Sequence, residues 1–504
     1  MKILYRHLSF LSIVCLMCFA SCQPKAPEAF QELKTAPTIY PDYTDVTIPP
    51  NIAPLTFAIR EEGEAFITRI SGQSGELLCK GNTVKPTLKK WHALLESEKG
   101  KSLTVDIFVK KGDTWSKFKS FTWHVAQDPI DPYLSYRLIA PSYVAYEKLT
   151  INQRDLTTYK ETEIYNNMLS STRNGGQCIN CHSYQNYSPD HFQFHARQEF
   201  GGTMLAIDDK LQKMDLKTDS TISAGVYPAW HPTQQVIAYS VNTTGQSFHT
   251  KDPQKVEVQD SHSDLILYDI EANTVQKIAA DTTELECFPW WSGDGNHLYF
   301  CSASYTHNEE FGDRKLMDDY KLIKYNLYRM PYNQATRTFG QRELVFDAAA
   351  QDKSATLPRP SPDGRWLVFT MGDYGVFHIW HKSSDLWIMD LSLPLEVAAA
   401  QARPLHEINS PDVESYHSWS SNSRWMVVSS RRDDGSYTRP YFSHINSDGT
   451  ATKPFILPQS SPEFYPDLFY SYNIPEFMNG PVTIKPQTFV PAFRKAAKKV
   501  SYKP

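Results

Sequence analysis

The segment LPRPSPDGRWLVFT (357–370) has the pattern of two short strands joined by a tight turn at SPDG. A third strand with an acidic residue follows it, DLWIMDLS (385–392). Copies of this pattern, aligned on Trp230, Trp291, Pro360 and Trp419, are spaced by 61, 69 and 59 residues. The other hairpins are YPAWHPTQQVIAYS (227–240), FPWWSGDGNHLYFCS (288–302) and YHSWSSNSRWMVVSS (416–430).

This repeat predicts a β-propeller. One four-stranded sheet per repeat, arranged radially about an axis, buries both faces of every sheet against its neighbours, which an isolated hairpin cannot do. Residues 192–218 fit a shorter copy and residues 135–168 a degenerate one. We therefore expect an all-β chain with a propeller of six blades over residues 131–460, with five or seven blades as the alternatives.

The regions outside the repeat predict an exported protein. Residues 1–21 have the basic start, short apolar run and small final residues of a signal peptide, and the run is too short to span a membrane. Cys22 follows FAS and is expected to carry lipid, which would anchor the chain in the bacterial envelope. Ordinary signal cleavage beside a chance cysteine is the alternative. No acidic cluster follows Cys22, so we expect the periplasmic side rather than the cell surface.

The remaining parts are assigned by composition and strand pattern. Residues 22–45 are rich in proline and polar residues and are predicted to be a linker. Residues 46–130 alternate in the manner of a small immunoglobulin-like or fibronectin-like β-sandwich, with TLKKWHALLES (87–97) as a short helix. Residues 461–504 are expected to form a C-terminal tail.

Charge and motifs exclude several functions. The formal net charge is −5 and no basic block stands out, so we expect no nucleic-acid partner. The sequence contains no G-x-S-x-G elbow, H-E-x-x-H motif, Walker loop or EF-hand series. An electron-transfer or binding protein is therefore favoured over an enzyme. The sparse cysteines after Cys22 do not indicate a disulfide scaffold.

The segment NGGQCINCHSYQNY (174–187) contains the spacing C-x-x-C-H. In c-type cytochromes the two thiols form thioethers with the haem vinyl groups, and the histidine binds iron. The motif predicts a covalent haem c on Cys178 and Cys181, with His182 as the iron ligand. Inert thiols, a disulfide, a redox pair, or an irregular zinc site that includes His191 are the alternatives. The candidates for the sixth iron position are His191, His195, Met168 and Met204.

The motif is expected in an insertion at 170–190, in a loop between two blades. Such loops emerge on the same propeller face as the long connections between second and third strands, and several histidines and aromatic residues are predicted to share that face. Cys287 and Cys301 are expected to lie opposite each other across a hairpin, as packed thiols or a disulfide, and Cys79 in the sandwich core. The residues predicted on the loop face are His249, His262, His307, His378, His381, His417, Tyr374, Trp380 and Trp419.

The hairpin SPDGRWLVFT followed by DLWIMDL resembles the TolB-type (WD-like) propeller repeat of exported bacterial proteins. With Cys22 and C-x-x-C-H, the whole chain is similar to propeller lipoproteins of Gram-negative anaerobes. The resemblance implies the fold and no chemistry. The functional hypothesis is a propeller scaffold with one haem c, serving electron transfer or haem-dependent sensing with a redox or other envelope partner. The alternatives are a haem-free binding module for protein, glycan or cell wall, and a haem peroxidase or lyase.

Overall fold

The hairpin at SPDG forms the two inner strands of a four-stranded antiparallel sheet. They are β27 (Ser354–Pro360) and β28 (Trp366–Gly372), and β29 (Asp385–Asp390) and β30 (Arg403–Pro404) complete the sheet. Its turn is held by the Ser361 hydroxyl, which donates to Asp363 at 2.5 Å and accepts from the Trp366 amide at 2.9 Å. Ser292-Asp294 and Ser420-Asn422 repeat this arrangement, so the sequence motif specifies the turn locally.

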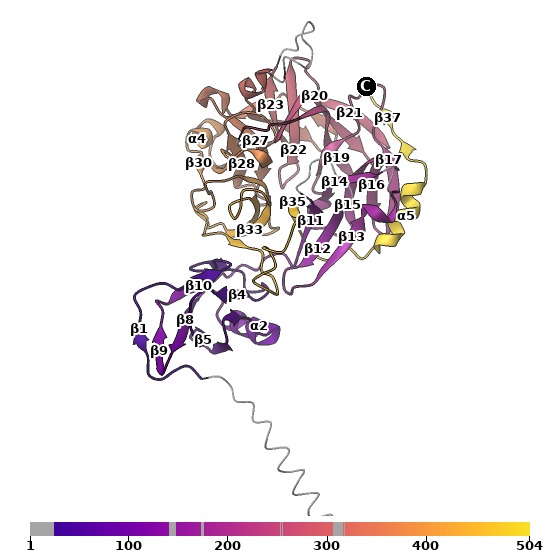
Figure 1. The fold of residues 1–504 in the computed structure, drawn as a ribbon. Helices are drawn as coiled ribbons and strands as arrows, with labels where there is room; N and C mark the ends of the chain where they lie inside the picture. Colours follow the sequence, from indigo (N-terminus) through magenta and orange to yellow (C-terminus); the bar gives the residue numbers. More distant parts are fainter. Residues whose placement is uncertain are drawn as a thin grey trace, which may run out of the picture.

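Such sheets are arranged radially in the larger lobe (Figure 1), and the predicted all-β propeller is confirmed. The structure is a computed structural model that describes residues 25–140, 148–172, 176–252, 254, 256–305, 316 and 318–504. We number the sheets of this described part as blades 1–6. Blade 5 is β27–β30. Blade 1 is β35 (Ser471–Met478), β11 (Tyr133–Ile139), β12 (Thr150–Asp155) and β13 (Glu161–Asn166), and blade 2 is β14 (Gln177–Tyr184), β15 (His191–Gln198), β16 (Gly202–Ile207) and β17 (Lys210–Asp215). Blade 3 is β18 (Val226–Trp230), β19 (Val236–Phe248), β20 (Val256–Asp269) and β21 (Thr274–Ala279), and blade 4 is β22 (Glu284–Trp291), β23 (His297–Ser304), β24 (Asn326–Asn333) and β26 (Glu343–Phe346), with β25 (Thr338–Phe339) at its edge. Blade 6 is β31 (Glu414–Trp419), β32 (Trp425–Ser430), β33 (Arg439–His444) and β34 (Phe455–Ile456).

Where the sequence predicts a tail, the chain closes the ring. Strand β35 pairs antiparallel with β11 as the inner strand of blade 1, so the first and last parts of the propeller share one sheet. Helix α5 (Pro486–Arg494) then packs Phe489 and Phe493 against Tyr165. The final strands β36 (Lys498–Lys499) and β37 (Ser501–Tyr502) pair with β17 and β21 along the outer rim (Figure 1).

The inner strand of each blade carries the same irregularity. The pairing with its neighbour shifts register at a β-bulge, and one residue in each bulge has a positive φ. These side chains meet around the axis: the rings of Tyr227 and Phe288 lie 4.5 Å apart and those of Phe288 and Tyr416 lie 6.4 Å apart. We call this set the bulge ring; it consists of Cys181 (φ 52°), Tyr227 (49°), Phe288 (51°), Leu357 (52°), Tyr416 (38°) and Ile474 (52°).

Tryptophans of the repeat link neighbouring blades. The indole N–H of Trp291 donates to the Ala229 carbonyl at 3.0 Å, and that of Trp419 donates to the Arg359 carbonyl at 2.9 Å. In each case the acceptor lies on the inner strand of the preceding blade, two residues after its bulge-ring residue. The Trp signal in the repeat therefore marks a buried hydrogen bond between blades as well as apolar packing.

The smaller lobe is built from two sheets and a helix. Helix α2 (Leu88–Ser97) confirms the helix predicted at 87–97, and it buries Trp91, whose indole donates to the Ile52 carbonyl at 2.9 Å. The seven-stranded sheet is β1 (Gln31–Glu32), β9 (Thr114–Lys117), β8 (Ser102–Lys111), β10 (Phe121–Val125) and β3 (Thr47–Ile48), with β5 (Ala65–Ser71) and β6 (Glu76–Lys80); the three-stranded sheet is β2 (Ile39–Tyr40), β4 (Phe57–Ile59) and β7 (Thr83–Val84).

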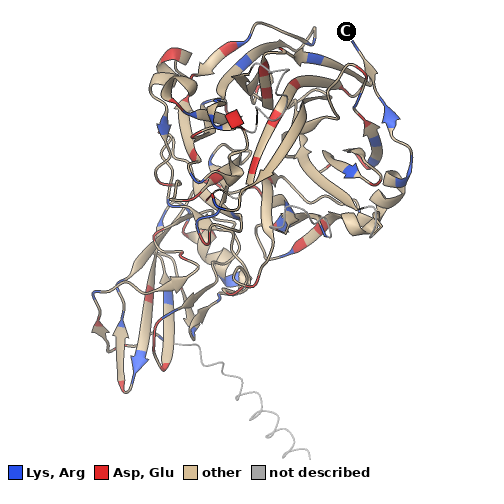
Figure 2. Cartoon of the chain, turned by 45° about the horizontal axis from the view of Figure 1, so that its top comes forward, with Lys and Arg blue, Asp and Glu red and all other residues tan. Residues whose placement is uncertain are grey.

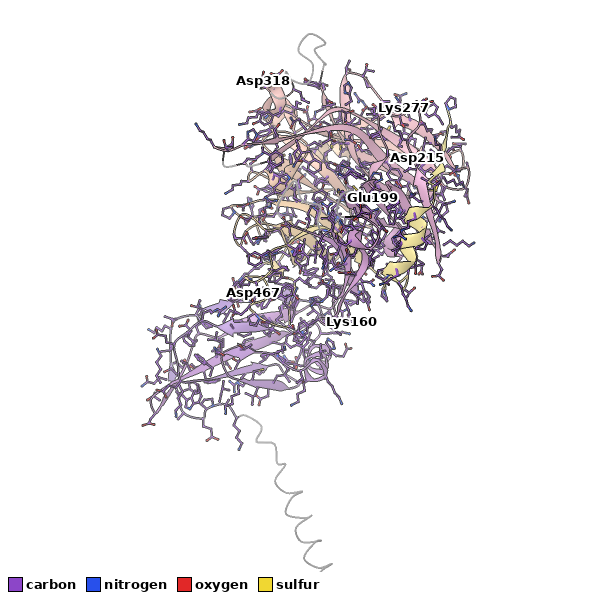
Figure 3. The ribbon with its side chains drawn as sticks, turned by 45° about the vertical axis from the view of Figure 1, so that its right-hand side comes forward. Lys160, Glu199, Asp215, Lys277, Asp318 and Asp467 are labelled. Atoms are coloured by element: carbon purple, nitrogen blue, oxygen red, sulfur yellow. The ribbon has the colours of Figure 1, made fainter. Side chains whose placement is uncertain are left out.

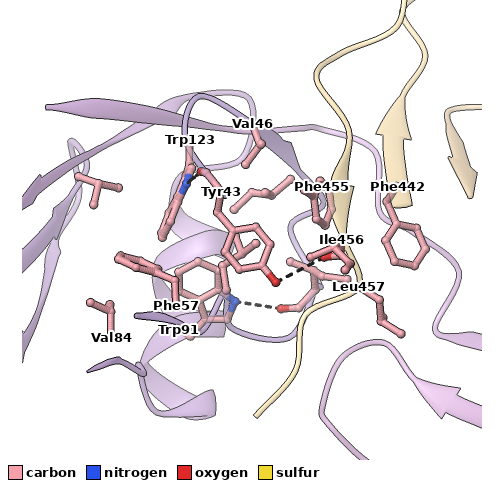
Figure 4. Close-up of a cluster of buried hydrophobic side chains, with 14 of the residues drawn as sticks. Tyr43, Val46, Phe57, Val84, Trp91, Trp123, Phe442, Phe455, Ile456 and Leu457 are labelled. Atoms are coloured by element: carbon pink, nitrogen blue, oxygen red, sulfur yellow. Dashed lines mark hydrogen bonds between the residues drawn. The ribbon is translucent and has the colours of Figure 1, made fainter. Parts of the chain in front are cut away.

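The two lobes share one hydrophobic core. Tyr43 and Trp123 of the small lobe belong to the same buried cluster as Phe455 and Ile456 of blade 6, and the Tyr43 hydroxyl donates to the Ile456 carbonyl at 3.4 Å (Figure 4). Lys160 and Asp467 lie beside this junction (Figure 3). Basic and acidic residues are interspersed over both lobes (Figure 2), in keeping with the small net charge.

Candidate functional site

The C-x-x-C-H motif lies on a strand, where the sequence predicts a loop. Residues Gln177–Tyr184 form β14, the inner strand of blade 2, and Cys181 is its bulge-ring residue. His182 therefore occupies the position that proline takes in Tyr227-Pro228 and Phe288-Pro289, and that His417 takes in blade 6. The motif is part of the propeller repeat, which explains its place without any cofactor.

Both cysteines of the motif are free thiols with little exposure. Cys178 is 9% exposed and packs in an apolar cluster with Ile179 and Phe194, whereas Cys181 is 2% exposed and faces the propeller axis. Burial raises the pKa of Cys181. A raised pKa disfavours the thiolate, so Cys181 is not set up as a reactive nucleophile.

His182 is buried beside a permanent cation. Its pKa is lowered to about 3, first by burial and then by the Arg137 guanidinium, and the backbones of Ile474 and Ser135 oppose this only in part. Neither ring nitrogen has a well-aligned hydrogen-bond partner. His182 is therefore neutral at physiological pH.

The four candidates for a sixth iron ligand have other surroundings. The His191 ring nitrogens lie 2.8 Å from the Gln185 amide oxygen and 3.2 Å from an Asp208 carboxylate oxygen, which are both acceptors. His195 is buried against the Thr203 hydroxyl (3.2 Å). Met204 is fully buried in β16, while Met168 is 44% exposed in a short helix before β14. No group of three potential metal ligands occurs in the described part of the chain.

The surroundings of the motif do not fit a haem in this conformation. The cavity next to Cys181 and His182 has a volume of about 20 Å³, which suits roughly one water. Bulge-ring side chains fill the rest of the axis, so a tetrapyrrole bonded to both sulfurs would have to displace the core. Haem attachment at Cys178 and Cys181 stays a prediction of the sequence. The lipid site predicted at Cys22 lies outside the described residues.

The loop face gathers part of the predicted set. His378 and His381 are buried with ring centres 5.4 Å apart, and His381 lies 3.2 Å from the Glu257 carboxylate. Tyr374 lies 4.7 Å from His381, and His249 stacks on Tyr320. Of the others, His262 is exposed on β20, and the Trp380 ring packs against the Arg431 guanidinium. His417 and Trp419 lie on the inner strand β31. His307 lies outside the described residues.

Cys287 and Cys301 are directly opposite each other on β22 and β23, as the sequence predicts, and both are fully buried free thiols. Burial raises the pKa of Cys287 and Cys301. Cys79 is a free thiol on β6 that is partly exposed and packs against the margin of the hydrophobic core of the small lobe.

A pocket opens at the end of the axis where the inner hairpins turn. Its volume is about 170 Å³, and the bulge ring closes its floor. The walls come from one position in every blade, two residues beyond the bulge-ring residue. Three of these six side chains are small, so the six do not fill the space around the axis and a cavity remains. The six are Ser183, Ala229, Trp290, Arg359, Ser418 and Glu476; we call the site the channel-mouth pocket.

Arg359 dominates the electrostatics of the channel-mouth pocket. Its guanidinium lies 3.6 Å from the centre of the Trp290 ring, and the residue is 9% exposed. Glu476 is the nearby carboxyl group that acts on the Arg359 charge, but among the described residues no ion pair within 4 Å joins Arg359 to a carboxylate. Its Nε is buried without a hydrogen-bond partner. Burial lowers the pKa of Arg359 to about 10, so it stays charged at neutral pH.

Glu476 faces the same pocket and is uncharged at neutral pH. Burial raises its pKa to about 8, although the Arg359 charge and the Tyr184 backbone lower it in part. A carboxylic acid with that pKa can donate a hydrogen bond at pH 7. Because Glu476 is mainly protonated at neutral pH, it offsets little of the Arg359 charge there.

The sequence did not reveal this pocket. Glu476 lies in the stretch expected to be a tail, and Ser183 lies in the stretch expected to be an insertion. The signal was present in the recurring pattern of the inner strands: CHSY (181–184) and IPEF (474–477) match YHSW (416–419) and YPAW (227–230).

Together these features define a β-propeller protein with an N-terminal β lobe and a cationic, tryptophan-lined pocket on the axis. No family model matches the sequence, and no curated protein matches it. Similar solved structures include the propeller domain of the Trilobed protease from Pyrococcus furiosus (10% identity, 84% of this chain, 98% of that chain, TM-score 0.33). Another is the oligogalacturonate lyase of Vibrio parahaemolyticus (12%, 60% and 85%, 0.31).

The chain is also similar to prolyl oligopeptidase B of Galerina marginata (9% identity, TM-score 0.35), covering 81% of this chain and 54% of that one. It spans 44% of a puromycin-hydrolyzing peptidase from Mycobacterium tuberculosis. Within the described ranges, no helix has the length and apolarity needed to cross a bilayer.

Proposed function

We propose that this chain is a non-catalytic binding protein of the bacterial envelope that captures a small carboxylated sugar in the channel-mouth pocket. One observation carries the proposal: Arg359 is a buried cation without a carboxylate partner, and it lines an open cavity. A buried charge is costly unless it is paired. A ligand carboxylate would supply the missing partner.

Size and lining support one sugar ring. The cavity measures about 170 Å³, and a cavity of about 150 Å³ accepts a ligand such as benzene. Trp290 and Trp230 offer aromatic faces, while Ser183, Ser418 and Asn186 offer neutral hydrogen-bonding groups to hydroxyls. This mixture of aromatic faces and neutral polar groups suits a polar ring with one anionic group.

Calorimetric titration of the full chain with glucuronate, glucose and benzoate tests the proposal. We expect glucuronate to bind at least tenfold more tightly than glucose, because a hydrogen bond to a charged group contributes about 1.5–3 kcal/mol. Arg359→Gln should remove this preference. Arg342→Gln is the matched control, since Arg342 pairs with Glu284 at the surface.

The pH profile provides a test that needs no substitution. Below pH 8 Glu476 is protonated and the Arg359 charge is free to attract an anion; above it the Glu476 carboxylate repels the ligand. Glucuronate affinity should therefore be flat from pH 6 to 7.5 and decrease at higher pH. Equal affinity for glucose, or an unchanged affinity at pH 9.5, would overturn the proposal.

A further inference from the structure

We propose that the N-terminal lobe binds an extended acidic peptide of another protein, which adds as a strand to the free edge of β6. Among the described strands, β6 pairs only with β5. A groove of about 620 Å³ runs along its other side, and one face of α2 forms the opposite wall. Strand addition to an exposed edge is a common mode of peptide recognition.

The register shows which backbone groups are free. The amides of Gly72 and Gly81 donate to the carbonyls of Gly75 and Phe66, so these pairs are hydrogen-bonded across β5 and β6. In an antiparallel ladder, hydrogen-bonded pairs alternate with non-bonded ones. The backbone N–H and C=O groups of Leu78 therefore point away from β5, toward the groove.

The dimensions suit a short strand. The five residues of β6 extend over about 17 Å, and the ten residues of α2 over about 15 Å. Thr87, Lys90, Leu94 and Ser97 follow each other along one face of the helix. A peptide of four to five residues would lie between the two walls, with side chains alternating between the two faces of the extended sheet.

Charge complementarity indicates the kind of peptide. Lys80, Lys85 and Lys90 line the groove, and none of them forms an ion pair with a carboxylate of the described chain. Glu76 is the acidic residue of the lining. Because three lysines gather at the end of β6 and the start of α2, an occupant with carboxylates at that end is favoured over a neutral or basic one.

Cys79 offers a direct reporter of occupancy. Cys79 lines the groove and is partly exposed, whereas Cys178, Cys181, Cys287 and Cys301 are buried. Iodoacetamide should therefore label Cys79 preferentially in the folded protein. A peptide seated on β6 would cover the thiol and slow its labelling, which mass spectrometry of the digested full chain can follow.

The test uses a fluorescent acidic peptide, TEVDVEV, and its basic counterpart, TKVKVKV, with the full chain. We expect the acidic peptide alone to raise anisotropy and to slow labelling of Cys79 at least threefold. Leu78→Pro removes an amide that faces the groove and should weaken binding at least tenfold, whereas Leu78→Ala keeps the amide and should bind within threefold of the parent. Replacing Lys80, Lys85 and Lys90 by Glu should abolish binding; Lys111→Glu, an exposed site on β8, is the charge control.

Each other outcome overturns the proposal. Equal binding of both peptides, or acidic binding that Leu78→Pro leaves unchanged, would contradict strand addition at this edge. If the chain self-associates and Leu78→Pro makes it monomeric, the occupant is a second copy and the assignment to an acidic peptide of another protein is wrong. The channel-mouth pocket lies in the other lobe, so failure here leaves the sugar-binding proposal untouched.

Discussion

Two inner strands of the propeller, β14 and β31, carry the matching segments CHSY (181–184) and YHSW (416–419), which share the central His-Ser pair. Both have a bulge with a positive φ at the first of the four, and both bury the histidine at the second. His417 lies 3.0 Å from the Val368 carbonyl on the second strand of the preceding blade, and the backbone of Ser135 faces His182 from the equivalent strand.

The two segments differ at their first residue and at their last, aromatic residue. Tyr416 becomes Cys181, and Trp419 becomes Tyr184, whose hydroxyl donates to Ser135 at 2.8 Å, again in the preceding blade. A single cysteine at the bulge, with another three residues earlier, is enough to turn a propeller strand into a haem-like motif. The chemistry of a short motif therefore depends on its place in the sheet, which the spacing of its residues does not give.

The largest expected effect tests whether Tyr184 and Trp419 are structurally equivalent. Trp419→Ala and Tyr184→Ala each remove a buried ring that bonds to the preceding blade, and each should lower the free energy of unfolding by about 3–5 kcal/mol. Urea unfolding followed by tryptophan fluorescence measures this. Phe469→Ala is the control at a side chain that is 67% exposed. A loss below 1 kcal/mol for Tyr184→Ala alone would show that β14 is not a structural copy of β31.

The fold was largely predictable because its turns are specified locally. The Ser-x-Asp turn and the following apolar strand recur in blades 4 and 5, and each needs only neighbouring residues. Blade 2 departs from this pattern: Tyr184 pairs with Phe192, eight residues on, whereas Trp419 pairs with Met426, seven residues on. That longer hairpin and the loss of Trp concealed β14 as an inner strand.

The channel-mouth pocket depends on ring closure, which local patterns do not encode. Glu476 reaches the axis only because β35 pairs with β11, more than 330 residues earlier in the chain. Arg359 lies within a recognised repeat, yet its significance comes from the small residues at the same position in other blades. The pocket therefore depends on long-range strand pairing and on the side-chain sizes at equivalent positions of the blades.

An intermediate effect concerns acid stability. Burial first lowers the pKa of His182 and of His417 to about 3, against about 6.5 in an unfolded chain. Between these values the unfolded chain binds protons that the folded chain does not, so stability is full above pH 6.5 and falls as the pH decreases. At pH 5 each histidine should therefore lower the free energy of unfolding by about 2 kcal/mol relative to neutral pH.

Replacing both histidines isolates this contribution. Between pH 7 and pH 5 the free energy of unfolding should fall by about 4 kcal/mol less in the double variant His182→Pro/His417→Pro than in the parent. Urea unfolding at each pH measures this difference. Buried acids such as Glu476 and Glu286 have a raised pKa and act in the opposite direction, but they are common to both proteins and cancel in the difference. Parallel pH profiles would contradict the assignment.

The smallest expected effect decides between the repeat and the haem motif. Four bulge-ring residues, among them Tyr227 and Ile474, precede a proline with φ near 50°, so the backbone at Cys181 already suits proline at the next position. His182→Pro should therefore change the free energy of unfolding at pH 7 by less than about 1 kcal/mol. If His182 binds haem iron, the same variant, made in a host that matures cytochromes, should instead lose or shift the Soret absorption of the parent.

The intact mass of both proteins decides between the two assignments. A mass equal to the processed polypeptide in both would assign C-x-x-C-H to the propeller repeat. A thioether-bound haem in the parent would show that the core around Cys181 opens to admit it.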